Sequence, residues 1–138
     1  MKKELFIQKL ICNYLRTNYP EIIFFSDLSG LRLPIGLATQ IKALKCNRGI
    51  PDLIILKPSM IYHGLCLEIK TEDVKLLKKN GDMYSDNHLT EQFYILFALY
   101  NCGYAGYFVQ GFEKARDCID FYLKGEAEKM PEKTNLIW

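Results

Sequence analysis

The sequence predicts an α/β fold, in which a mixed central β-sheet is flanked by helices and the elements follow the order α-β-α-β-β-α-β-α. Two observations predict this fold. Helix signals, either apolar side chains at helical spacing or residues suited to helix ends, mark four segments. Between them lie four short stretches of β-branched, aromatic or continuous apolar residues, as is typical of strands. The length of 138 residues fits one domain with a real core.

The first part of the chain predicts a helix, a strand and a short second helix. Residues 4 to 18 repeat apolar side chains at helical spacing. Residues 22 to 28 have the β-branched and aromatic composition of a strand. Within residues 31 to 47, Pro34 is suited to the first turn of a short helix. The apolar side of that helix would consist of Leu37, Ile41 and Leu44.

The middle of the chain predicts two neighbouring strands and a long polar loop. Residues 52 to 56 and 65 to 70 are the strands, and residues 57 to 64 between them form a hairpin loop. Residues 71 to 88 are polar and rich in lysine. Because long polar loops inside compact domains often carry function, we expect this loop to serve the site.

The last part predicts a helix, a strand and a final helix. Thr90 is a good N-cap for a helix that runs from Glu91 to Asn101, and Gly103 supplies its C-terminal stop. Residues 104 to 109 form a strand and residues 112 to 123 the last helix.

The elements together define one domain over residues 1 to 125, followed by a charged tail over residues 126 to 138. No signal peptide or membrane span is visible. The five cysteines are scattered and contain no Cys-x-x-Cys motif, which disfavours a zinc site or a disulfide framework and points to a reducing cytoplasm. Four of them lie in apolar stretches and are interpreted as small buried hydrophobes: Cys12, Cys66, Cys102 and Cys118.

Charged residues stand in the two central strands, where an apolar side chain would be expected. Asp52 opens the first strand, and Glu68 and Lys70 lie near the end of the second. Because successive strand residues point to opposite faces, Glu68 and Lys70 share a face. Pro-Asp is common at turns and Glu-x-Lys at solvated strand ends, so either motif alone is better explained by structure. Together, two acids and a lysine on adjacent strands can hold a divalent cation and activate a water molecule.

These motifs resemble a known family. Pro51-Asp52 followed by Glu68-Ile69-Lys70 is similar to the PD-(D/E)xK nuclease signature. More narrowly, the chain resembles the VRR-NUC (virus-type replication-repair nuclease) domain, small stand-alone forms of which occur in phages and bacteria. Three segments carry this resemblance, which extends from the first helix to the last: Arg48-Gly49-Ile50-Pro51-Asp52-Leu53, Glu68-Ile69-Lys70-Thr71 and Leu89-Thr90-Glu91-Gln92. It implies a restriction-endonuclease-like core.

The resemblance also implies a role for each matching residue. Asp52 and Glu68 would bind Mg²⁺ or Mn²⁺ through their carboxylates, and the backbone carbonyl of Ile69 would add a ligand. Lys70 would orient or help deprotonate the attacking water, with its pKa lowered by the metal. Gln92 would lie in the first turn of its helix, close to the catalytic lysine or the scissile phosphate. No small-molecule cofactor beyond the metal is implied.

Other residues leave alternatives open. Glu4 matches an acidic position that some family members use near the metal, but an acid in the first turn of a helix is stabilising in any case. His63 and His88 are interpreted as loop histidines, although His88 could touch phosphate. Three aromatic residues recur at helical spacing and are interpreted as core, or in part as a dimer surface: Phe93, Tyr94 and Phe97.

The implied function is a metal-dependent DNA endonuclease. Stand-alone members of the resembled family act as homodimers on branched DNA such as four-way junctions, in a bacterial or phage-infected cell. Tyr107, Phe108 and the last helices would build the dimer. Alternatives are a nuclease for duplex, single-strand or flap DNA, a DNA-binding module without catalysis, and a structural protein with a chance motif match.

The charge distribution predicts where DNA would lie. A formal net charge of +2 does not by itself demand a nucleic-acid partner. Two local clusters of basic residues would instead contact phosphates without reading sequence. They consist of Lys42, Lys45, Arg48, Lys75, Lys78 and Lys79.

Overall fold

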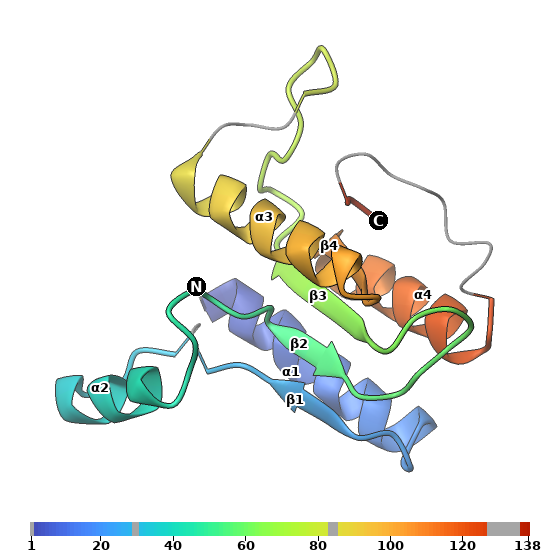
Figure 1. The fold of residues 1–138 in the computed structure, drawn as a ribbon, viewed down its shortest axis with the longest axis horizontal. Helices are drawn as coiled ribbons and strands as arrows, with labels where there is room; N and C mark the ends of the chain where they lie inside the picture. The colour runs from blue at the N-terminus through green and yellow to red at the C-terminus, as the bar shows by residue number, and fades with distance from the viewer. Residues whose placement is uncertain (1, 29–30, 83–85, 127–135) are drawn as a thin grey trace.

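A four-stranded mixed sheet forms the centre of the molecule, in a computed structural model that describes residues 2–28, 31–82, 86–126 and 136–138 (Figure 1). Most of the predicted tail, residues 127–135, lies outside the described residues. The strands lie side by side in chain order and are β1 (Phe24–Ser26), β2 (Leu53–Ile55), β3 (Leu65–Lys70) and β4 (Ala105–Gln110).

Strand direction follows from the connections. β1 pairs with β2 and β2 with β3 in antiparallel fashion, and the second pair is joined by the predicted hairpin loop. β3 and β4 are parallel, with Glu68 opposite Phe108 and Lys70 opposite Gln110. A parallel pair requires a long crossover, which α3 (Asn87–Asn101) supplies. The mixed sheet and the predicted element order are therefore confirmed.

Helices cover both faces of the sheet. α1 (Lys2–Asn18) and α4 (Gly111–Leu123) share one hydrophobic core with side chains of β2, β3 and β4. α3 packs on the opposite face, in a second core that includes Cys66 and Phe108. None of the helices among the described residues combines the length and the apolar character needed to cross a membrane.

The alternation along β3 decides where its charges point. Leu65, Leu67 and Ile69 enter the core shared with α1 and α4, whereas Cys66 enters the core under α3. Glu68 and Lys70 have the parity of Cys66, so both lie on the α3 side of the sheet. The predicted shared face of Glu68 and Lys70 is confirmed.

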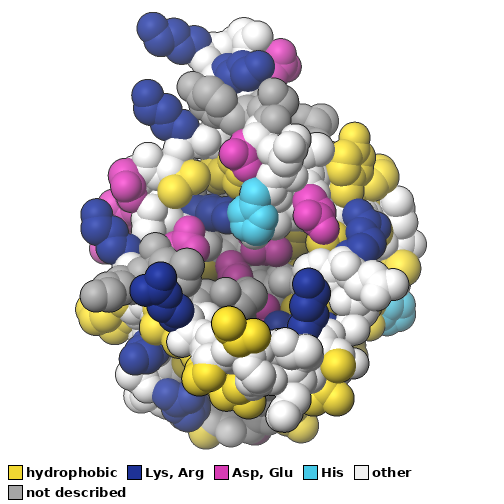
Figure 2. Space-filling view, turned by 90° about the vertical axis from the view of Figure 1, so that its left-hand side faces the viewer, with side chains coloured by type: hydrophobic (Ala, Val, Ile, Leu, Met, Phe, Trp, Pro, Cys, Tyr) yellow, Lys and Arg dark blue, Asp and Glu magenta, His cyan; other side chains and the backbone are white. Residues whose placement is uncertain are grey.

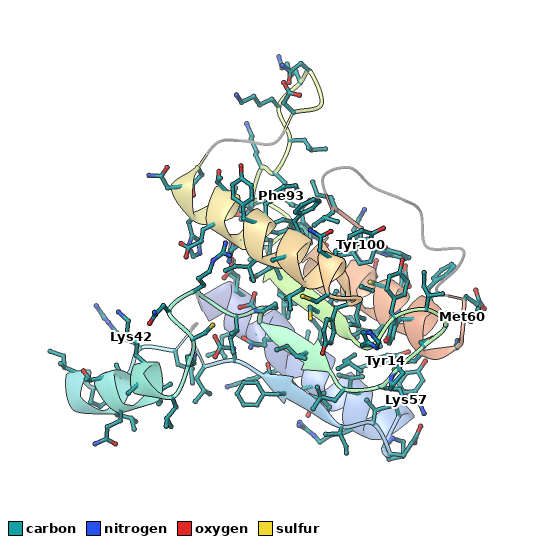
Figure 3. The ribbon with its side chains drawn as sticks, viewed as in Figure 1. Tyr14, Lys42, Lys57, Met60, Phe93 and Tyr100 are labelled. Carbon is teal, nitrogen blue, oxygen red and sulfur yellow. The ribbon has the colours of Figure 1, made fainter. Side chains whose placement is uncertain are left out.

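α2 (Ile35–Ala43) differs from the other helices because none of its residues is buried. The short helix after Pro34 forms as predicted, but Leu37 is 45% and Leu44 87% exposed, so its apolar side does not enter a core. Figure 1 shows α2 projecting from the body of the molecule, and Figure 3 places Lys42 on this projection.

The start of α3 corrects one prediction. Asp86 is the N-cap, and its carboxylate accepts the backbone N–H groups of His88 and Leu89. Thr90 therefore lies inside the first turn and is not the cap. The aspartate satisfies the free N–H groups one turn earlier, which lengthens the helix at its N-terminus. At the other end Gly103 has φ +94°, the left-handed conformation expected of a C-terminal stop.

Of the four cysteines interpreted as buried, Cys102 is exposed and Cys12 is only partly buried, whereas two residues interpreted as surface are buried. Cys66 and Cys118 lie in the cores, but Cys102 is exposed because it caps the solvent-facing end of α3. Tyr107 and Phe108 are buried within the sheet, so the prediction that they form a dimer surface is wrong.

The aromatic residues of α3 divide between core and surface. Phe93 packs against the core under α3, as predicted, whereas Tyr94 is 56% and Phe97 47% exposed. The interpretation of these two as core is therefore wrong. Phe93 and Phe97 stack with a centroid separation of 6.2 Å. Figure 3 shows Phe93 and Tyr100 extending from the same side of α3.

Candidate active site

A cavity of about 360 Å³ lies where the N-termini of α1 and α3 approach the ends of β1, β2 and β3. Figure 2 shows this face of the molecule: Asp and Glu side chains gather near its centre around a hollow, and most Lys and Arg side chains lie around them. The lining residues are Glu4, Asp27, Lys45, Gly49, Ile50, Asp52, Glu68, Lys70, His88, Glu91, Gln92 and Ile95.

Asp52 is held at the point where the ladder between β2 and β3 ends. Its side-chain Oδ2 accepts the backbone N–H of Ile69 over 2.8 Å, while its backbone carbonyl accepts the N–H of Asp27 over 2.9 Å. The carboxylate thus stands where a strand carbonyl would otherwise bind Ile69. Burial raises the pKa of Asp52, and the Ile69 N–H opposes that rise.

Glu68 is the most deeply buried acid of the cavity, with 1% of its surface exposed. Burial, and after it the negative charge of Asp52, raises the pKa of Glu68 to about 9. Its Oε2 accepts the side-chain N–H of Gln92 over 3.0 Å. Without a cation, the adjacent carboxyls of Glu68 and Asp52 therefore favour keeping a proton at neutral pH.

Lys70 lines the same cavity and is 6% exposed. Its positive charge lowers the pKa of both Asp52 and Glu68, against the stronger effect of burial. Among the described residues, Lys70 forms no salt bridge. The ammonium is therefore placed beside the acids and at the cavity wall, where an anion entering the cavity would meet it.

Gln92 lies at the sixth position of α3, in the second turn, because the helix starts at Asn87. The prediction of a first-turn position is wrong, yet the side chain still reaches Glu68. Its Oε1 is buried and, within the part of the chain that the structure describes, has no hydrogen-bond partner. A buried acceptor of this kind fits a bound water or another donor inside the cavity.

Glu4 and His88 also line the cavity. The charge of Glu4 raises the pKa of Asp52, so α1 brings a further acid near the predicted pair. Of the two readings left open for Glu4, its position favours the one that places it at the site. The interpretation of His88 as a loop histidine is wrong, because His88 lies in the first turn of α3, where the Asp86 carboxylate accepts its backbone N–H.

Asp27 is a cavity residue that the sequence reasoning missed. It is 4% exposed, its carboxylate forms an ion pair with Lys45, and its charge raises the pKa of Glu68. The signal was present: like Asp52, Asp27 is an acid at the end of an apolar strand, a costly position unless the charge is compensated. Lys45, predicted to contact phosphate, instead reaches into the cavity, whereas Lys42 and Arg48 are exposed.

The donor set fits a hard divalent cation. The described residues contain no group of three His, Cys, Asp or Glu close enough to hold a metal by themselves. Mg²⁺, however, is commonly bound through one or two carboxylates with water in its remaining positions. Asp52 and Glu68 supply two such carboxylates, and Gln92 Oε1, which has no partner among the described residues, supplies an acceptor for a water. A cation would offset the burial and the neighbouring negative charges that raise the pKa of both acids.

Comparisons with known proteins agree with this architecture at the level of the fold. No protein-family model matches the sequence, and no curated protein does. The solved structure of a protein described as a VRR_NUC domain protein is similar, with a TM-score of 0.60, 22% sequence identity and coverage of 88% of each chain. The chain has a VRR-NUC domain fold. The predicted restriction-endonuclease-like core is therefore confirmed.

Proposed function

We propose that the protein is a Mg²⁺- or Mn²⁺-dependent DNA endonuclease that cuts branched DNA as a homodimer. The observation that carries the proposal is the convergence of Glu4, Asp52, Glu68, Lys70 and Gln92 in one cavity, on the fold of a VRR_NUC domain protein. These residues come from four separate elements or their ends, and packing of the hydrophobic cores alone does not require polar groups there.

Each cavity residue would have a distinct role in phosphodiester hydrolysis. Asp52 and Glu68 would hold the cation with the Ile69 carbonyl, and Ile69 N–H keeps the Asp52 carboxylate oriented. The bound cation would supply Lewis-acid stabilisation of charge on the phosphate and lower the pKa of water. Lys70 would orient the attacking water. As the neutral amine it would accept the proton that this water loses, and the ammonium so formed would offset charge on the phosphate. Gln92 would fix Glu68 through its N–H and accept a water hydrogen at Oε1.

Basic residues on two projections support DNA as the substrate. Lys42 and Arg48 are exposed on and after α2, and the loop before α3 carries exposed lysines. These lysines are Lys75, Lys78 and Lys79. Because α2 and the loop extend on opposite sides of the α3 N-terminus in Figure 1, DNA lying across the cavity would meet both.

The homodimer would place two such cavities on one symmetric substrate. A two-fold arrangement suits paired cuts in a four-way junction. The exposed aromatic side of α3, formed by Tyr94, Phe97 and Tyr100, would supply the surface for self-association. Tyr94→Glu combined with Phe97→Glu should then convert a dimer to a monomer in light scattering, with the melting transition retained.

The activity is tested with purified protein, Mg²⁺ and a panel of labelled four-way junction, flap, single-strand and duplex DNAs. We expect the junction to be cut fastest, and EDTA to abolish cutting. Asp52→Asn and Lys70→Met should bind the junction but not cut it, while Glu21→Gln, an exposed acid outside the cavity, should cut normally.

The outcomes separate the alternatives. Equal cutting of every DNA would leave a nuclease but remove selectivity for branched substrates. DNA binding without cutting would indicate a binding module, and absence of both would indicate a protein whose motif matches by chance. Undiminished cutting by Asp52→Asn would refute the assignment of the site.

A further inference from the structure

Gln8 on α1 is a buried amide at the back of the acid cluster, with 7% of its surface exposed. Its side-chain nitrogen donates to Ser26 Oγ over 2.6 Å, to the Asp27 carbonyl over 2.9 Å and to the Asp52 carbonyl over 3.2 Å. All three acceptors belong to the strand ends that carry the cavity acids. One side chain therefore joins α1 to the ends of β1 and β2.

The contacts of Gln8 belong to a wider set that fixes the Asp52 backbone. The Asp52 carbonyl also accepts the Asp27 N–H over 2.9 Å and the Ser26 hydroxyl over 3.3 Å. At the other end of the same residue, Asp52 Oδ2 accepts the Ile69 N–H. Asp52 is consequently held both through its backbone and through its carboxylate, and Gln8 anchors the backbone side.

Gln8 also sets where α1 lies relative to the strands. Glu4 precedes it by one helical turn, so both side chains lie on the same face of α1. Glu4, Asp27, Asp52 and Glu68 line one cavity, so their carboxylates repel one another when they are ionised. Lys45 and Lys70 offset part of this repulsion, and the three hydrogen bonds of Gln8 hold α1 against the remainder.

We infer that Gln8 is a positioning residue of the metal centre, one that touches neither metal nor DNA but sets the spacing of Glu4, Asp27 and Asp52. This role rests on the proposed function. It gives α1 a positioning role through Gln8 that is separate from the carboxylate of Glu4. The neutral amide suits the task, since it donates to carbonyl oxygens without adding charge to a cavity that is already lined by five acids.

The test uses Gln8→Met, which keeps the length and apolar bulk of the side chain but removes both donor hydrogens. Metal binding is measured without DNA, by calorimetric titration with Mn²⁺, and the hydrogen exchange of the Ile69 amide is followed in the metal-free protein. We expect Mn²⁺ to bind about 10-fold more weakly, as is typical when a partner of a metal ligand is lost. Exchange at Ile69 should accelerate, and kcat should fall about 10-fold while KM for DNA stays within about 3-fold.

Tyr19→Phe is the matched control, because it removes a part-buried hydrogen bond from the residue that follows α1 to Asp120 of α4, and neither residue lines the cavity. It should lower the melting temperature but leave the Mn²⁺ affinity unchanged. If Gln8→Met does not fold, Ser26→Ala is tested in its place. It should weaken Mn²⁺ binding about 3-fold, a smaller loss than for the amide, because two hydrogen bonds are removed rather than three and Gln8 keeps its bonds to the Asp27 and Asp52 carbonyls.

The results distinguish this inference from the proposed function. Wild-type protein that binds no Mn²⁺ and cuts no DNA would overturn both. Wild-type protein that binds and cuts, together with Gln8→Met or Ser26→Ala variants that match the affinity of Tyr19→Phe, would overturn the positioning role alone. Weaker Mn²⁺ binding with unchanged Ile69 exchange would also overturn it, because the Asp52 carboxylate would then be held without Gln8.

Discussion

The metal-free protein should lose stability as the pH rises from about 4.5 to 9, and Glu68→Gln should remove that loss. Burial and the charge of Asp52 raise the pKa of Glu68 from 4.5 to about 9. The folded state therefore holds a proton that the unfolded chain releases over this range. The corresponding stability is complete below pH 4.5 and disappears as the pH approaches 9.

The size of the effect follows from the same pKa. Between pH 4.5 and pH 8 each pH unit costs about 1.4 kcal/mol, which gives roughly 5 kcal/mol if nothing relaxes. Because water and neighbouring groups rearrange around an ionised buried carboxylate, we expect about 2 to 4 kcal/mol. For a chain of this length that amounts to about 5 to 15 °C in melting temperature at pH 8.

The assay is thermal unfolding in EDTA from pH 5 to pH 8.5, with wild type, Glu68→Gln and the control Glu21→Gln. Other acids contribute to the pH profile of every variant, so the difference from wild type isolates Glu68. Adding Mg²⁺ at pH 8, at ten times its Kd, should raise the free energy of unfolding of wild type by about 1.4 kcal/mol and so raise its melting temperature, and it should raise neither for Glu68→Gln. Parallel profiles for wild type and Glu68→Gln would refute the reasoning.

Three further predictions concern the surroundings of the site. Gln92→Leu leaves Glu68 Oε2 without its donor and should slow single-turnover cleavage about 10- to 100-fold with little change in DNA affinity; an unchanged rate would count against it. Lys45→Met should destabilise the protein by about 2 kcal/mol and Asp27→Asn by less, because only Lys45→Met leaves a deeply buried charge, that of Asp27, without its ion-pair partner. Urea unfolding measures both variants, and a larger loss for Asp27→Asn would contradict the prediction. Replacing the loop lysines by alanine should reduce the slope of log K against log salt by about 0.9 for each lost phosphate contact, measured by fluorescence anisotropy in EDTA, and an unaltered slope would exclude the loop from the DNA path. The loop residues changed together are Lys75, Lys78 and Lys79.

Much of the fold could be predicted because its signals are local. Helical spacing over α1 and the apolar runs of β2 and β3 depend on near neighbours in the chain, and the structure has these elements in the predicted order. The alternation of strand side chains was enough to place Glu68 and Lys70 on one face. Asp52 was recognisable because a carboxylate beside a buried strand needs compensation.

The same local signals gave wrong predictions where two side chains could cap one helix, or where an apolar side chain had no neighbouring element to pack against. Asp86 caps α3 in place of Thr90, since either side chain could accept the free N–H groups and only the path of the loop decides which does. Tyr94 and Phe97 have the spacing of core residues but are exposed. The side of α3 that packs on the sheet instead presents Leu89, Phe93, Leu96 and Leu99 to the core. α2 forms as its sequence predicts, yet nothing in the part of the chain that the structure describes buries any of its residues.

The sequence by itself determined which charged groups stand in the central strands: two acids and a lysine on adjacent strands, at a spacing that resembles a nuclease motif. Only the tertiary structure decided how they are held. The ion pair of Asp27 with Lys45, the contact of Gln92 with Glu68 and the three hydrogen bonds of Gln8 join residues 18 to 44 positions apart. Such contacts cannot be predicted from a periodic sequence pattern, because they depend on where the hydrophobic cores bring separate elements together.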